Sequence, residues 1–162
     1  MINPTLTLID IRRVQRYLFN ANELKQNLGA SALVEQATHE WIFKFLPEKR
    51  NAQWNEQKYQ VDFEDMAIEK DQLDAEVIFM GGGNAAILFS TFQEARGFTE
   101  KYTDFLLVNA PGLEAAVAHV ENVDMSNNGA LNKAWKKMQE IEMPRQKEVY
   151  LLESLIPTFS TL

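Results

Sequence analysis

The chain has 162 residues, no cysteine and a formal net charge of −7 at pH 7. This length suits one domain with a sizeable core, and the lack of cysteine excludes disulfides and thiolate metal sites. The acidic balance disfavours direct binding of duplex nucleic acid, which relies on lysine and arginine against phosphates. No apolar run approaches the roughly 20 residues that span a bilayer, and no signal-peptide pattern opens the chain. A cytoplasmic protein without a membrane segment is therefore expected.

The first part of the chain predicts a strand followed by helical structure. Residues 5–11 alternate and are rich in β-forming residues, which predicts a strand that ends near Asp10. Residues 12–19 have the spacing of a short helical segment. A longer amphipathic helix follows and stops at Pro47. Its apolar positions recur with a period of about 3.6: Leu33, Val34, Ala37, Trp41, Ile42 and Phe45.

Residues 48–74 interrupt this pattern. They are polar and rich in charge, and they predict an irregular insertion between core elements, with an edge strand over residues 58–63. The acidic run in the insertion is expected to be a solvated surface. Two short strands then follow, over residues 76–80 and 85–90, and a glycine-rich turn joins them.

The remaining elements are a helix, a strand and a last helix. Thr91 and Glu94 match a capping box and predict the start of a helix that ends by Pro111. Residues 113–123 predict a fourth strand, and residues 127–143 predict a last helix. The helix after Thr91 is expected to bury Phe92, Ala95, Phe98, Tyr102 and Phe105.

The order of these elements predicts the fold class. A β-α-β-β-α-β order is typical of the ferredoxin-like α+β arrangement, an antiparallel sheet with strand order 4-1-3-2 and helices on one face. Residues 1–148 form this domain, with an extra C-terminal helix. Residues 149–162 are apolar to the end, and we expect them to lead into a further domain of a longer protein.

The predicted topology brings distant polar residues to the glycine turn. In a 4-1-3-2 sheet the end of the first strand lies beside the start of the third, which places Asp10 next to Gly82, Gly83 and Asn84. Two interpretations of the glycines remain open. They either serve a turn that needs positive φ, or they let backbone amides approach phosphate oxygens.

Two segments of the sequence resemble a known family. "IDIRRVQRYLFNANELKQNLGASALVEQAT", residues 9–38, and "VIFMGGGNAAILF", residues 77–89, are similar to a palm domain of the large, polymerase-like subunit of type III CRISPR effector complexes. The matching features are an aspartate that ends the first strand, the "VQRYLF" segment, the "GAS" turn before a helix, and a glycine hairpin. The resemblance covers about residues 6–122 without the 48–74 insertion.

The departures from this family point to a degenerate palm. Active palms carry two acidic residues after the paired glycines, whereas this chain has Gly83 and Asn84 there. Two-metal phosphoryl chemistry needs several carboxylates, and Glu121 and Asp124 are expected at the opposite end of the sheet. The chain alone is therefore not expected to be a cyclase or polymerase. The resemblance implies the first, catalytically degenerate palm, which would share ATP with a second palm inside a nucleotidyl cyclase that acts in antiviral defence.

The candidate site follows from the hairpin and from this resemblance. A metal, Mg²⁺ or Mn²⁺, would be held by Asp10, and ATP phosphates would meet the hairpin, the helix start and one basic residue. A solvated helix face is the alternative for most of Arg12, Arg13, Arg16 and Lys25. His39 and His119 have no acidic cluster nearby in sequence, so neither is expected to bind metal. The predicted nucleotide-binding residues are Gly81, Gly82, Gly83, Asn84, Ser31 and Arg12.

Two hypotheses of different classes result. In the first, the chain binds a nucleotide or completes a composite ATP site with a second palm, among the subunits of a CRISPR effector. In the second, the chain is a structural or protein-interaction domain that keeps the palm fold without a ligand, and it docks through the apolar residues 149–162.

Overall fold

The computed structural model describes residues 4–12, 32–111 and 113–124, together with residues 129, 132 and 136. Outside the described residues lie the predicted helical segment at 12–19 except Arg12, which belongs to a strand, most of the predicted helix at 127–143, and the apolar residues 149–162. None of the helices among the described residues has the length and apolar character to cross a bilayer.

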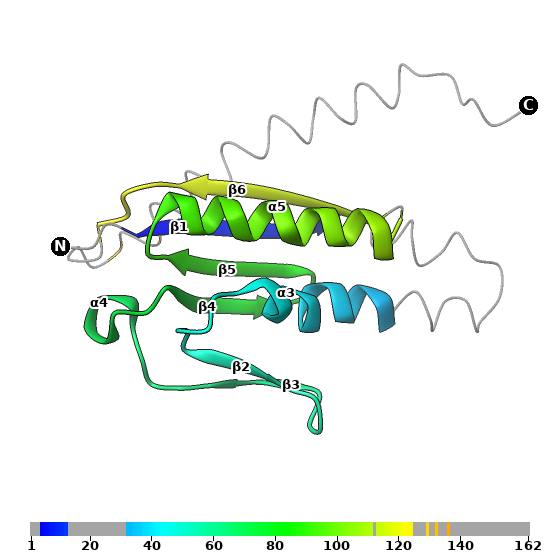
Figure 1. Cartoon of the computed structure of the whole chain (residues 1–162), viewed down its shortest axis with the longest axis horizontal. Coiled ribbons are helices and arrows are strands. Elements are labelled where there is room, and N and C mark those ends of the chain that lie inside the picture. Colours follow the sequence, from blue (N-terminus) through cyan, green and yellow to red (C-terminus); the bar gives the residue numbers. More distant parts are fainter. Residues whose placement is uncertain are drawn as a thin grey trace, which may run out of the picture.

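The centre of the molecule is a four-stranded antiparallel sheet (Figure 1). Its strands are β1 (Thr5–Arg12), β4 (Ala75–Gly81), β5 (Asn84–Phe89) and β6 (Glu114–Val120), in the order β4-β5-β1-β6. Counted among these four core strands, this order is 4-1-3-2, so the ferredoxin-like prediction is confirmed. The last strand is shorter than the predicted 113–123.

Helices cover one face of this sheet. Residues 32–38, α3 (Glu40–Phe45) and α5 (Phe92–Asn109) lie on the same side in Figure 1. The Thr91 hydroxyl accepts a hydrogen bond from the Glu94 amide at 3.2 Å, which confirms the predicted cap of α5. The core between helices and sheet is apolar and aromatic, and the Phe98 and Tyr102 rings stack with centroids 5.6 Å apart. The helix-side core residues on the strands include Ile9, Ile11, Val77, Ala85, Ile87 and Phe89.

The first long helix is broken at His39, where the sequence predicts one continuous helix. His39 has non-helical dihedrals, with φ −123° and ψ −82°. Just before it, the Thr38 hydroxyl donates to the Val34 carbonyl at 3.0 Å, a side-chain contact that bends helices. The buried Tyr102 hydroxyl donates to the Ala37 carbonyl at 2.8 Å and thereby ties the bend to α5. Burial raises the pKa of Tyr102, which keeps its hydroxyl a donor.

A second apolar layer packs against the other face of the sheet. Leu6 and Leu8 of β1 and Leu88 of β5 are buried there with Ile68 of α4 (Ile68–Asp71). Successive side chains of a strand point to opposite faces, so β1 contributes alternate residues to both layers. This strand is therefore buried on both sides.

The 48–74 insertion is more regular than predicted. Besides α4 it contains β2 (Ala52–Asn55) and β3 (Gln60–Phe63), which pair as a separate two-stranded sheet. The strand expected over 58–63 is therefore present at 60–63, and β2 was not predicted. The buried Asn51 side chain joins the insertion to the edge strand β4: its amide nitrogen donates to the Val77 carbonyl at 3.1 Å and its oxygen accepts the Val77 amide at 2.7 Å.

We expect Glu76→Gln to stabilise the fold at neutral pH. The Glu76 carboxylate accepts the Ile68 amide at 2.7 Å at the start of α4, but burial, and then Glu69 and Asp71, raise its pKa. A raised carboxyl pKa means that the charged form weakens the folded state above the ordinary pKa. Glutamine keeps the acceptor without the charge.

Urea unfolding at pH 7 checks this, with Glu76→Ala as the matched control. Alanine loses the cap and should lower the free energy of unfolding by about 1 kcal/mol. A Gln variant as unstable as the Ala variant would show that the charge itself is needed.

We expect His119 to make the fold sensitive to mild acid. Its Nδ1 lies 2.9 Å from the Thr7 hydroxyl and its Nε2 lies 3.5 Å from the Thr99 hydroxyl. Burial lowers the pKa of His119, and Glu121 only partly opposes this. The folded state therefore binds the proton more weakly than the unfolded state, so stability should fall as the pH drops below the ordinary histidine value of about 6.5.

The check is the free energy of unfolding between pH 7.5 and 5.5 for the wild type and His119→Gln. The wild type should lose stability across this range more steeply than the variant. Parallel curves would assign the acid sensitivity to other groups.

Candidate functional site

The glycine hairpin is a tight two-residue turn between β4 and β5. Gly81 and Asn84 form the last pair of the ladder, and Gly82 and Gly83 between them have φ of +61° and +85°. Positive φ at both central residues is the requirement of a type I′ hairpin, which glycine meets without steric cost. The conformational interpretation of the glycines therefore accounts for Gly82 and Gly83.

The tip of the hairpin is joined to the end of β1. Asp10 pairs with Asn84 in the register of β1 and β5, and the Ile11 amide donates to the Gly83 carbonyl at 2.8 Å. The predicted meeting of Asp10 with the hairpin is thus confirmed. Asn84 also contacts the turn, since its side-chain amide donates to the Gly82 carbonyl at 3.4 Å.

One row of residues at this end faces away from α5. Gly81 pairs with Asn84, Asn84 with Asp10, and Asp10 with Ala116. Directly paired residues in antiparallel strands lie on the same face of the sheet. Because Ile9 and Ile11 pack into the helix-side core, Asp10 and its row lie on the opposite face. One carboxylate and one amide are therefore held side by side, flanked by two residues with minimal side chains.

Gly81 is not explained by the turn. It has no positive φ, and among the residues that the structure describes a Cβ placed on it would meet only the Phe79 ring, at 3.6 Å, an ordinary contact. Neither backbone conformation nor packing requires glycine there. Phe79 lies beside it and is 46% exposed, an apolar neighbour of the hairpin that the sequence analysis did not single out. The alternation along β4 could not identify it, because a register shift between Val77 and Phe79 interrupts the strand.

The structure describes only part of the other predicted site residues. The backbone of Arg12 pairs with Glu114 at the same end of the sheet as the hairpin, and Ser31 lies outside the described residues. Glu121 and Asp124 follow the end of β6, where Val120 pairs with Leu6, so they lie at the opposite end, as predicted. Among the residues the structure describes, no group of three or more histidine, aspartate or glutamate side chains is placed to hold a metal ion.

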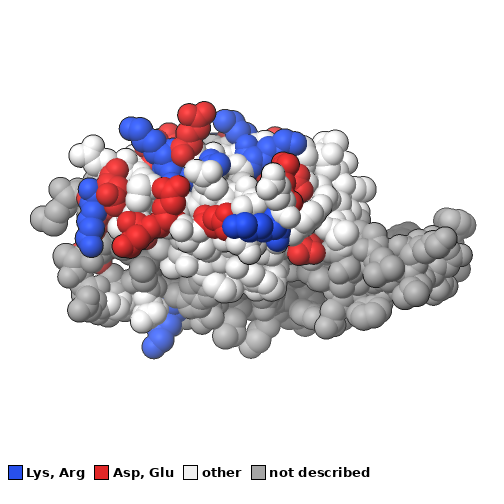
Figure 2. Space-filling view, turned by 90° about the horizontal axis from the view of Figure 1, so that it is seen from below, with Lys and Arg blue, Asp and Glu red and all other residues white. Residues whose placement is uncertain are grey.

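The described residues form no continuous basic area on the face shown in Figure 2. On the face shown in Figure 2, lysine and arginine side chains of the described residues are interspersed with aspartate and glutamate. A surface of this kind does not favour a nucleic-acid backbone.

Comparison with known proteins finds similar solved structures. No protein-family model matches this sequence, and no curated protein matches it. Three crystal structures of a Csm1–Csm4 cassette match the fold, one apo, one in complex with cA4 and one in complex with cA3. Their TM-scores are 0.57, 0.58 and 0.59, at sequence identities of 15%, 15% and 16%. Each match covers 90% of this chain and 19% of the other chain, so this chain corresponds to a small part of that protein. The likeness shows the fold and agrees with the resemblance seen in the sequence.

The three glycines should respond differently to alanine. Gly82→Ala and Gly83→Ala each force a side chain into the left-handed region, and we expect each to cost about 1–2 kcal/mol of unfolding free energy. Gly81→Ala should change stability by less than about 0.5 kcal/mol. Urea unfolding of the three variants under one set of conditions is the measurement. A large loss at Gly81 would mean that the fold itself requires this glycine.

Proposed function

We propose that this chain is a catalytically degenerate palm domain that binds a nucleotide, or completes a composite ATP site with a second palm, in a CRISPR-type effector complex. The observation that carries the proposal is the row of Gly81, Asn84 and Asp10 at the hairpin tip. Among the described residues Gly81 has no conformational or packing reason to lack a side chain, and close approach of a ligand to the backbone gives it one.

The proposed site suits a nucleotide with its own metal ion. Mg²⁺ is commonly bound through one or two carboxylates together with substrate phosphates and water. Asp10 supplies one carboxylate, and Asn84 beside it supplies an amide oxygen or a donor for a phosphate oxygen. Arg12 and Ser31 are the proposed further contacts of the triphosphate. Such a site binds ATP with Mg²⁺ or Mn²⁺ weakly, because the protein contributes little charge to the metal.

The same residues argue against catalysis by this chain alone. In-line phosphoryl transfer with two metals needs carboxylates that hold both cations a few ångströms apart. The hairpin offers Gly83 and Asn84 at the positions where the active members of the resembled family carry acids, and Glu121 and Asp124 follow the far end of β6. The proposal therefore assigns catalysis to a second palm, on the same or another chain.

The proposed partners are that second palm and the other subunits of an effector. Support comes from the three structural neighbours, which are parts of a two-protein cassette and in two cases hold cA4 or cA3. A role in antiviral defence and in the production of a signalling nucleotide belongs to the proposed complex.

A purely structural role is the second candidate. Leu107 and Val108 near the end of α5 are 70% and 78% exposed, and in this alternative they would belong to a larger apolar contact surface for a partner protein. In this alternative the hairpin binds no ligand.

A titration of ATP with Mg²⁺ or Mn²⁺, followed by NMR, distinguishes the two candidates. We expect the amides of Gly81–Asn84 and of Ser31 to shift at millimolar ATP. Gly81→Val should remove these shifts, because its side chain would occupy the face of Asp10 and Asn84 without forcing a positive φ. Asp10→Asn should remove the metal dependence.

The control variant is Leu107→Ser, which changes the exposed end of α5 and leaves the hairpin as it is. It should bind ATP like the wild type. An unchanged spectrum of the wild type at millimolar ATP would contradict nucleotide binding by this chain alone and would favour the structural role or a site that forms only with the second palm. Turnover of ATP or GTP by the chain alone would contradict the degenerate assignment.

A further inference from the structure

Phe79 is placed beside the glycine hairpin by an irregularity in β4. The register of β4 against β5 shifts after Val77, and Ile78 is left as an extra residue. Phe79 therefore pairs with Ala86 instead of Ala85. Ala85 belongs to the helix-side core and Ala86 to the apolar layer on the other face, so the bulge moves Phe79 to the face away from α5. Bulges that redirect a side chain in this way are common next to functional sites.

The Phe79 ring leans toward the hairpin tip and is open to solvent. A Cβ built on Gly81, two residues further along the same face, would lie 3.6 Å from Cζ and 3.8 Å from Cε2 of this ring. Phe79 is 46% exposed. Its strand is at the edge of the main sheet, and α4 lies at the end of β4 away from the hairpin (Figure 1). The ring is therefore an aromatic surface on the same face as the row of Gly81, Asn84 and Asp10.

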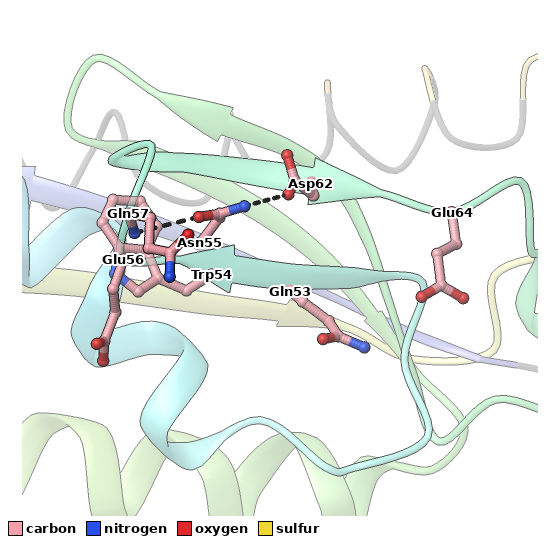
Figure 3. A pocket seen from close by; sticks show the side chains of 7 residues that line it. All are labelled: Gln53, Trp54, Asn55, Glu56, Gln57, Asp62 and Glu64. Carbon is pink, nitrogen blue, oxygen red and sulfur yellow. Dashed lines mark hydrogen bonds between the residues drawn. The ribbon is translucent and has the colours of Figure 1, made fainter.

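A hollow elsewhere in the structure does not suit a nucleotide. It has a volume of about 560 Å³ and runs along the β2–β3 hairpin (Figure 3), where its lining includes the carboxylates of Glu56, Asp62 and Glu64. The described residues that line it include no lysine or arginine. Because this charge repels a triphosphate, a nucleotide is not expected there.

We infer that Phe79 is the stacking surface for the base of a nucleotide bound at the glycine hairpin. The inference rests on the function proposed above and adds where the base lies. β4 and β1 are two strand spacings apart, about 10 Å, so the two ends of one nucleotide can occupy both strands. The phosphates and their metal ion lie over Asp10 and Asn84, and the base lies over Phe79. Gly81, which lies between them, leaves room for the sugar.

The surroundings of the ring predict that the base is held without being identified. Stacking on an aromatic side chain tolerates any base, because every base has a π-face. Ala86 and Leu8 continue the row of Phe79 across the sheet, and neither has a side chain that could hydrogen-bond to the edge of a base. Phe79 therefore adds affinity for ATP and GTP alike.

Paired titrations of ATP and inorganic tripolyphosphate into the full chain, each with Mg²⁺, test this inference. The readouts are the NMR shifts of the Gly81–Asn84 amides and of the Phe79 ring protons. Only ATP carries a base, so only ATP should shift the ring protons. It should also bind about tenfold more tightly than tripolyphosphate.

The deciding variant is Phe79→Leu, which keeps an apolar side chain without the ring. It should weaken ATP and GTP about tenfold and leave the affinity for tripolyphosphate unchanged, which also shows that the hairpin has kept its fold. The matched control is Phe63→Leu on β3. It removes a comparably exposed ring, 55% exposed, away from the glycine hairpin, and it should bind ATP like the wild type.

The two ligands separate failure of this inference from failure of the proposed function. If Phe79→Leu binds both ATP and tripolyphosphate like the wild type, the stacking surface is overturned and the nucleotide site stands. An equal loss of both ligands in this variant would overturn the inference in favour of a ring that only supports the hairpin. Binding of neither ligand by the wild type would overturn both the stacking surface and nucleotide binding by this chain alone.

Discussion

The register of β1 between β5 and β6 is the constraint on which the rest of the structure depends. This strand pairs on both edges and is buried on both faces, through Ile9 and Ile11 toward the helices and through Leu6 and Leu8 on the other side. A shift of one residue would exchange these two sets of side chains. It would also move Asp10 away from Asn84 and turn it toward the apolar core. The pairing that builds the core thus also places the polar row at the hairpin.

Much of this architecture could be predicted from sequence because its causes are local. Alternation identified β1, the short apolar runs on either side of the glycines identified β4 and β5, and the Thr91 cap marked the start of α5. The antiparallel order then placed Asp10 beside the hairpin without any spatial information. On α5 the period also identified three of the buried residues, Ala95, Phe98 and Tyr102.

The structure differs from the sequence prediction where a contact between residues far apart in the chain determines the local conformation. The break at His39 depends on Thr38 and on the hydroxyl of Tyr102, which lies far along the chain. Residues 48–74 lack a strong hydrophobic periodicity. Their regular structure depends on the hydrogen bonds of Asn51 and on the burial of Ala52. At the candidate site, sequence could indicate that three glycines meet an aspartate. It could not show that two of these glycines serve the turn while Gly81 serves neither turn nor packing.

The Asn51 side chain has a consequence for how the molecule behaves in solution. β4 lies at the edge of the main sheet, and an unpaired edge strand is a template on which another chain can add by strand pairing and aggregate. The Asn51 side chain bonds both the amide and the carbonyl of Val77, as a residue of a neighbouring strand would. These two backbone groups are therefore not open to pairing with another chain. The side chain that holds the insertion in place therefore also occupies a position on this edge where another strand could pair.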